Sequence, residues 1–134
     1  MTKSYKVAGH VFNLTIPDGS NIWARLTQYD PFLLDSSVQD PLFTLELVKE
    51  LPEGERVTVL APETEDGETV IRLLKQQDDW YIEASPDHRI PTVAQTLASR
   101  DFKRGRIRIV SSRMSDAVFG INNALMLLYA FTMA

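Results

Sequence analysis

The twenty residues from Ser115 to Ala134 constrain the fold more than any other part of the sequence, because they form one long apolar segment. They read SDAVFGINNALMLLYAFTMA and contain a single charged residue, Asp116. Ser115 is a suitable N-cap, and Asp116 favours the positive end of a helix dipole. At about 1.5 Å per residue, such a helix is about 30 Å long. The sequence therefore predicts an α-helix over residues 115–134.

The second half of this predicted helix is apolar on every side, from Ala124 onward. That pattern is typical of a helix buried on more than one side, whereas a sheet covers only one. No basic residue or C-cap glycine closes the end of the helix. We therefore expect it to pack against another chain, or the polypeptide to continue past Ala134 and cover it. The residues expected at this interface are Leu125, Leu128, Tyr129 and Phe131.

The residues before the helix form short runs that alternate between apolar and polar side chains, as β-strands do. A hairpin is expected over residues 5–16, bent at Ala8–Gly9. Further strands, at intervals of about 10 to 14 residues, are expected over residues 42–48, 56–61, 69–76, 80–84, 92–98 and 106–110. Asp66-Gly67 predicts a tight hairpin turn between the second and third of these runs. Short polar turns between consecutive strands predict an antiparallel meander.

One short helix is expected over residues 22–29, capped by Ser20 or Asn21. Its predicted end is Asp30–Pro31, because a residue before proline avoids helical dihedrals. The predicted fold class is α+β: a mostly antiparallel β-sheet or open barrel, one short helix and a long C-terminal helix. A length of 134 residues fits one domain, with a β-rich body over 1–114 and the helix over 115–134. This domain would stand alone or form the N-terminal part of a longer protein.

The amino-acid composition excludes several kinds of functional site and argues against some kinds of binding partner. The chain has no cysteine, which excludes disulfides, thiolate metal sites and a cysteine nucleophile and suits the cytoplasm. Its 14 basic and 18 acidic residues give a net charge of −4, which argues against nucleic-acid binding by the chain as a whole. The uninterrupted apolar part of the tail is about half as long as a membrane-spanning helix, so no membrane insertion is expected.

The search for catalytic, metal-binding or cofactor-binding residues predicts none. His10 and His88 have no carboxylate or second histidine at ligand spacing in the sequence. The acidic residues of the hairpin tip do not match a calcium-binding loop and are expected to be solvated; they are Glu63, Glu65, Asp66 and Glu68. The glycines form no phosphate-binding loop. The chain is therefore expected not to be an enzyme by itself.

A basic cluster stands out in this acidic chain and includes Arg104, Arg106 and Arg108. Arg106 and Arg108 fall on one face of a predicted strand, whereas Ile107 and Ile109 fall on the other. Two arginines at this spacing could hold a phosphate or carboxylate group. Charged runs of this kind are more commonly the solvated outer face of a sheet, and that interpretation is preferred here. We expect any contact with an anion or an anionic partner at these three arginines.

Several phrases of the sequence resemble a known family. The run FGINNALMLLYAFTMA resembles the helix that precedes the nucleotide-binding domain in bacterial proteins similar to HPr kinase/phosphorylase, within the PEP-carboxykinase-like group. The phrases AGHVFNL, YDPF and PLFTLEL look like the β-rich N-terminal region of such proteins. The glycine-rich phosphate loop of that family is absent, so the resemblance carries over no catalytic residue. It implies an accessory module that packs against a kinase-like domain.

Three functional hypotheses follow. The first is a non-catalytic N-terminal module of a kinase-like protein, which contributes packing, dimerisation or substrate docking. The second is a free-standing interaction protein, which would form a homo-oligomer if the chain ends at Ala134. The third is a small-ligand-binding domain with a pocket between sheet and helix, where Asn122 and Asn123 could supply polar groups. The expected partner is thus the protein's own C-terminal domain or a second copy of the chain.

Overall fold

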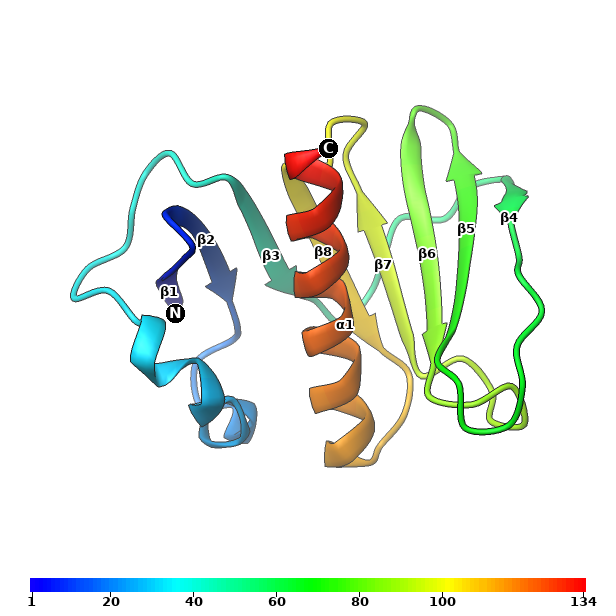
Figure 1. Cartoon of the computed structure of the whole chain (residues 1–134), viewed down its shortest axis with the longest axis horizontal. Helices are drawn as coiled ribbons and strands as arrows, with labels where there is room; N and C mark the ends of the chain where they lie inside the picture. The colour runs from blue at the N-terminus through cyan, green and yellow to red at the C-terminus, as the bar shows by residue number, and fades with distance from the viewer.

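The computed structural model describes all 134 residues and shows one open, eight-stranded β-sheet with a single long helix across one face (Figure 1). The strands are β1 (Thr2–Val7), β2 (His10–Thr15), β3 (Phe43–Leu47), β4 (Arg56–Leu60), β5 (Val70–Gln76), β6 (Asp79–Ser85), β7 (Ala94–Ala98) and β8 (Arg104–Ile109). The helix α1 covers Met114–Met133, and two 3-10 helices, η1 (Asn21–Arg25) and η2 (Thr27–Phe32), follow β2. The predicted α+β class is confirmed, and the sheet is open rather than closed into a barrel.

The strand order is β1-β2-β3-β8-β7-β6-β5-β4. The predicted meander is confirmed from β4 to β8, where each strand pairs antiparallel with the next one along the chain. The middle of the sheet differs, because β3 pairs parallel with both β2 and β8. The chain leaves β3, crosses behind the sheet to the far edge and returns strand by strand (Figure 1). Two segments distant in sequence, β3 and β8, therefore lie side by side at the centre.

The turns and the short helix agree only in part with the sequence. The hairpin bend at Ala8–Gly9 is confirmed, and both residues adopt positive φ angles of 50° and 83°. Helical structure lies where the sequence predicted it over residues 22–29, but it is divided into two 3-10 helices. The predicted end before Pro31 is wrong, since Pro31 lies inside η2. Its fixed φ suits 3-10 dihedrals, and so short a helix loses only one backbone donor to the proline.

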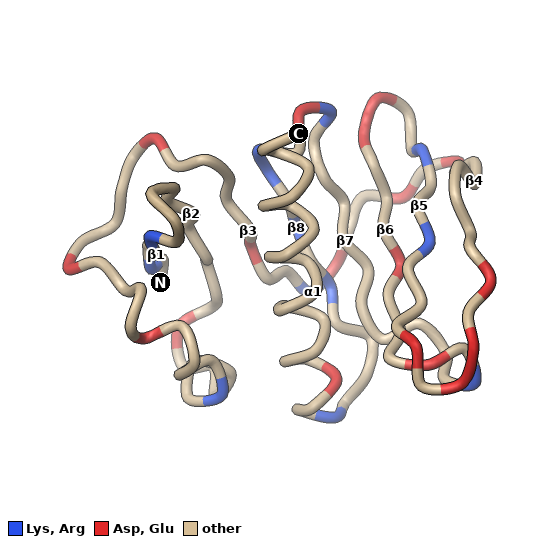
Figure 2. The backbone as a smooth tube through the Cα atoms, in the orientation of Figure 1, with Lys and Arg blue, Asp and Glu red and all other residues tan.

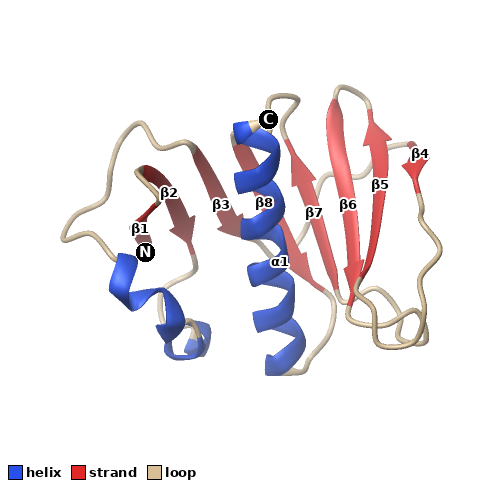
Figure 3. Ribbon diagram, in the orientation of Figure 1, coloured by secondary structure: helices blue, strands red, loops and turns tan.

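The helix α1 packs on the sheet through one face, and the rest of it faces away (Figure 3). Its buried residues are Gly120, Ile121, Asn123, Ala124, Leu125 and Leu128. It begins at Met114, one residue before the predicted start, and the hydroxyl group of Ser111 donates a hydrogen bond of 2.6 Å to the Asp116 carboxylate in its first turn. The sheet therefore covers only one side of this apolar helix, as expected, and the other side stays open within the chain.

Two glycines allow α1 to lie very close to the sheet. A Cβ atom on Gly120 would come within 2.7 Å of the Ala94 Cβ on β7, well inside normal contact distance. A Cβ on Gly105 of β8 would come within 2.8 Å of a methyl group of Leu128. The backbones of the helix and of the two central strands thus approach each other where neither glycine carries a side chain.

A second, smaller apolar cluster lies on the sheet face opposite α1. Leu74, Tyr81 and Leu97 are buried there, and Leu51 from the β3–β4 crossover packs on them. The Gln76 side chain donates a hydrogen bond of 3.0 Å to the Pro52 carbonyl and so fixes the crossover to β5. This segment covers part of the face on which the predicted arginines lie.

Candidate functional site

The outer surface of α1 and the segments beside it form a shallow apolar groove of about 680 Å³. It is lined by Val7, Phe12, Tyr29, Thr69, Phe119, Asn122, Asn123, Leu125, Met126, Tyr129 and Ala130. Among these residues the side chain of Met126 is 65% exposed, and Met133 is 48% exposed nearer the end of the helix. Such exposed apolar side chains in a row are typical of a surface that another molecule covers.

The polar groups of this groove already have partners within the chain. The Tyr29 hydroxyl donates a hydrogen bond of 2.7 Å to the amide oxygen of Asn122, which also accepts one from Gln28 at 3.2 Å. The Tyr129 hydroxyl donates to the Val7 carbonyl at 2.8 Å. Burial raises the pKa of Tyr29, so its phenol remains a donor over a wide pH range. These bonds tie α1 to η2 and β1, and they leave a mainly apolar surface open to a ligand.

The four interface residues predicted from the sequence fall in different places. Leu125 and Leu128 are 3% and 0% exposed because they pack on the chain's own sheet, and only the edge of Leu125 borders the groove. Tyr129 is half-buried and bonded to β1. Phe131 is 37% exposed and packs on Phe102, with ring centroids 4.7 Å apart. The outer face of α1 therefore includes Tyr129 and Phe131 from the predicted set, together with Met126, which was not predicted.

No charged residue follows Asp116 in α1, so the tube of this helix in Figure 2 is tan from its second turn to its end. By length and composition alone the helix is apolar enough to cross a membrane, with a mean hydropathy of 1.2. Core helices of other proteins meet the same criterion, and α1 packs on the sheet as such a helix does. The helix thus presents a long uncharged surface next to a packed core.

The predicted arginines lie on the sheet face opposite α1. Arg106 and Arg108 share that face as predicted, because Ile107 between them is fully buried on the α1 side. They do not converge on one site. Arg108 donates to the Lys49 carbonyl at 3.2 Å and to the Gln95 side chain at 3.0 Å. Arg104 and Arg106 line a separate hollow of about 470 Å³.

The hollow beside Arg104 and Arg106 is not purely basic. The carboxylates of Glu46 and Asp79 line it as well, together with the hydroxyl groups of Thr44 and Ser99. Two negative charges beside two positive charges weaken the attraction for an anion. This arrangement fits a polar surface that a partner could touch better than a dedicated phosphate site.

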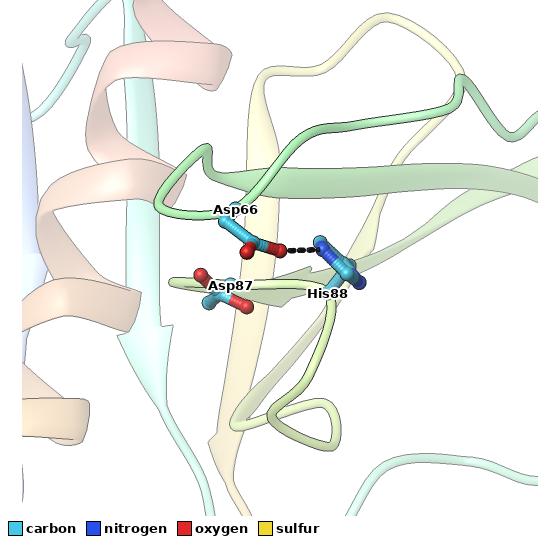
Figure 4. Close-up of side chains that lie close together, drawn as sticks. All are labelled: Asp66, Asp87 and His88. Carbon is cyan, nitrogen blue, oxygen red and sulfur yellow. Dashed lines mark hydrogen bonds and ion pairs between the residues drawn. The ribbon is translucent and has the colours of Figure 1, made fainter.

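A further cluster joins two loops at one end of the sheet (Figure 4). Asp66 lies between β4 and β5, whereas Asp87 and His88 lie between β6 and β7. The Asp66 carboxylate and Nε2 of His88 are 2.6 Å apart. Both side chains are exposed, as expected for a solvated turn and a histidine in a loop, but their contact was not predicted. No local pattern in the sequence predicts this pair, because a contact across 22 residues depends on how the two loops meet in the fold.

Asp87 holds the cluster together and is itself almost fully buried. Its carboxylate accepts hydrogen bonds from the Arg89 side chain at 2.8 and 2.9 Å, from the Arg89 backbone at 2.8 Å and from the Gly67 backbone. These bonds, led by the guanidinium of Arg89, hold the pKa of Asp87 well below its usual range. Arg89 neutralises Asp87, and Asp87 in turn bonds to the Gly67 backbone of the other loop, so the cluster holds the two loops together. A cation would have to displace that arginine.

Comparison with known proteins gives no relative of this chain. No protein-family model matches it, and neither do any curated protein sequence or solved structure. The outer face of α1 is therefore the candidate site on physical grounds, because it is a mainly apolar groove on a helix that carries no charge after Asp116.

Proposed function

We propose that the chain is a non-catalytic accessory module that packs, through the outer face of α1, against a nucleotide-binding domain of a kinase-like protein. The observation that carries this proposal is the uncharged, exposed stripe of α1 centred on Met126. Covering one methionine or phenylalanine side chain contributes roughly 1.5 to 3 kcal/mol. A partner that buries several residues of this stripe would therefore gain enough free energy for specific docking.

The kind of partner is proposed from the resemblance of the α1 sequence to the helix before the phosphate loop in HPr kinase-like proteins. In such an arrangement the helix has the sheet on one side and the second domain on the other. The one-sided packing of α1 on its own sheet supports this geometry. We accordingly propose a bacterial, cytoplasmic protein in which this domain serves packing or substrate docking.

Two alternatives use the same surface. A second copy of the chain could pack its outer α1 face on this one, which would give a homodimer. A small apolar ligand could occupy the groove, whose polar groups at Tyr29 and Asn122 are already bonded to each other. That internal bond is the reason to prefer a protein partner, because few free polar groups remain to orient a small molecule.

The test is site-specific photocrosslinking in the native cell. A photoreactive side chain replaces Met126, and a matched control carries it at exposed Glu46 on the opposite face of the sheet. We expect position 126 alone to crosslink to a peptide of a nucleotide-binding domain, identified by mass spectrometry, whether that domain lies in the same polypeptide or in a separate one. A crosslink only to a second copy would support the homodimer instead. The absence of any crosslink specific to position 126 would overturn the proposal.

A further inference from the structure

The two edge strands of the sheet differ in how far other segments of the chain cover them. At one edge, residues 33–38 cover β1: Leu33 forms a bridge with Tyr5, and the Leu34 backbone donates to the Ser4 carbonyl at 2.9 Å. The Val38 backbone N–H donates a hydrogen bond to the Ser4 hydroxyl, and the Asn13 side chain donates one to the Val38 carbonyl, each with a length of 2.8 Å. At the other edge, β4 pairs only with β5, and no segment lies along its outer side (Figure 1).

The uncovered edge is unusually apolar for a strand in contact with water. All five residues of β4 are exposed, and Val57, Val59 and Leu60 are 62%, 54% and 58% exposed. In an edge strand, alternate backbone N–H and C=O groups point outward without a partner. Native proteins commonly protect such edges with charged side chains or proline. Within β4 the single charged residue is Arg56 at its beginning.

Arg56 does not protect the edge, because its side chain is turned onto the sheet. Its Nε donates to the Gln76 side chain at 2.8 Å, and its guanidinium lies 3.9 Å from the centre of the Tyr81 ring. The segments on either side of β4 are acidic and exposed. Glu53 and Glu55 precede the strand, and Glu63 and Glu65 follow it. In Figure 2 these flanking loops carry most of the red segments at that end of the molecule.

We propose that β4 is a docking edge for an extended segment of a partner protein, which adds to the sheet as a further strand. The segment has apolar or β-branched residues in its middle and lysine or arginine at both ends. Its backbone would pair with the outward groups of β4, and its basic ends would lie beside the glutamates at both ends of the strand. With five residues in β4, the paired part is about 17 Å long.

Charge argues against a second copy as the occupant. In an antiparallel pairing of β4 with itself centred on Thr58, Glu53 of one copy lies opposite Glu63 of the other. Like charges directly opposite each other destabilise a strand pair. The register shift between Thr58 and Leu60 adds local twist and makes indiscriminate pairing harder. The acidic flanks therefore select a basic segment.

This proposal is independent of the proposed function, because β4 lies at the edge of the sheet and α1 lies across its centre (Figure 3). The probe is a fluorescent peptide with the sequence Lys-Lys-Val-Thr-Val-Thr-Val-Lys-Lys, and the matched control has glutamate in place of each lysine. Fluorescence anisotropy with the intact chain measures both dissociation constants at low and high salt. We expect the basic peptide to bind, with weaker binding at high salt, and the acidic peptide not to bind.

The chain variant for this test is Glu53→Lys/Glu55→Lys, which changes two exposed side chains outside the strand. It should weaken binding of the basic peptide about tenfold, since each reversed surface charge replaces an attraction by a repulsion. Hydrogen exchange supplies the second measurement: the outward-facing backbone amides between Val57 and Leu60 should gain protection when the basic peptide is added, and those of β1 should not change.

Three results would overturn the proposal. The first is equal binding of the basic and acidic peptides. The second is no binding of the basic peptide, or binding that protects amides other than those of β4. The third is a dimer in light scattering whose β4 amides are protected without peptide, which would assign the edge to a second copy.

Discussion

Replacing Gly120 with alanine tests how closely α1 lies on the sheet. Helix propensity alone would make the variant more stable, because alanine in a helix interior is favoured over glycine by about 0.5 to 1 kcal/mol. The tertiary structure opposes this gain. The new methyl group would lie 2.7 Å from the Ala94 Cβ and 2.9 Å from a methyl group of Ile109. The Ala94 methyl is fixed to the backbone of β7 and cannot rotate away.

The magnitude follows from the two opposing effects. Carbon atoms pack best at about 3.5 to 4.0 Å, so α1 would have to move away from β7 by about 1 Å. Overpacking of this kind costs about 1 to 3 kcal/mol. After the gain in propensity, we expect Gly120→Ala to lower the free energy of unfolding by about 1 kcal/mol. With a urea slope of about 2 kcal/mol per molar, the midpoint falls by about 0.5 M.

A double-mutant cycle isolates the contact. In Ala94→Gly/Gly120→Ala the opposing methyl group is removed, so the double variant should be more stable than the sum of the single changes by about 1 to 3 kcal/mol. The helix propensity itself is calibrated with Met126→Ala and Met126→Gly, which differ at a site that is 65% exposed. Those two variants should differ by about 1 kcal/mol, with alanine the more stable.

Urea unfolding followed by far-ultraviolet circular dichroism measures Gly120→Ala, Ala94→Gly, the double variant and the two Met126 variants under the same conditions. The reasoning would be refuted if Gly120→Ala raised the midpoint as much as propensity alone predicts. It would also fail if the cycle were additive within about 0.5 kcal/mol, since the two methyl groups would then not meet.

Three further predictions concern the core and the titrating groups. Leu128→Ala should lower the free energy of unfolding by about 2 to 5 kcal/mol, because Leu128 is fully buried. Met126→Ala, at an exposed position, should change it by less than about 0.5 kcal/mol. Similar losses for the two variants in urea unfolding would contradict the assignment of the two faces of α1. Burial raises the pKa of Tyr5 to about 12, so its contribution to stability is complete below pH 10 and is lost as the pH rises through 12. Ultraviolet titration should show a phenol that ionises near pH 12, and Tyr5→Phe should remove that step while the raised pKa of Tyr29 persists; a pKa near 10 for every tyrosine would contradict this. Arg89 lowers the pKa of Asp87, so the contribution of this carboxylate is present above pH 4 and is lost as the pH falls below that value. Asp87→Asn should be less stable at pH 7 and should lose less stability on acidification. An unchanged acid dependence of the urea midpoint would argue against the stabilising contact between the two loops at Asp87.

The sequence predicted those features that depend on neighbouring residues. Strict alternation placed Arg106 and Arg108 on one face of β8 and Ile107 on the other. The bend at Ala8–Gly9 followed from glycine's freedom to adopt positive φ. A twenty-residue stretch without strand signals predicted α1 to within one residue of its start. Period and turn chemistry are local properties, and so the sequence alone carries them.

Only the tertiary structure decided which strands meet and which side of α1 faces inward. The parallel pairing of β3 with β2 and β8 joins segments far apart in the chain, and no local pattern specifies such a pairing. An all-apolar helix has no polar side to mark its exposed face. The inward face of α1 is the one where Gly120 lets the helix backbone approach Ala94, and it places Leu128 in the core rather than at an interface. Close packing between distant segments makes that choice, because the free energy depends on the fit of both surfaces.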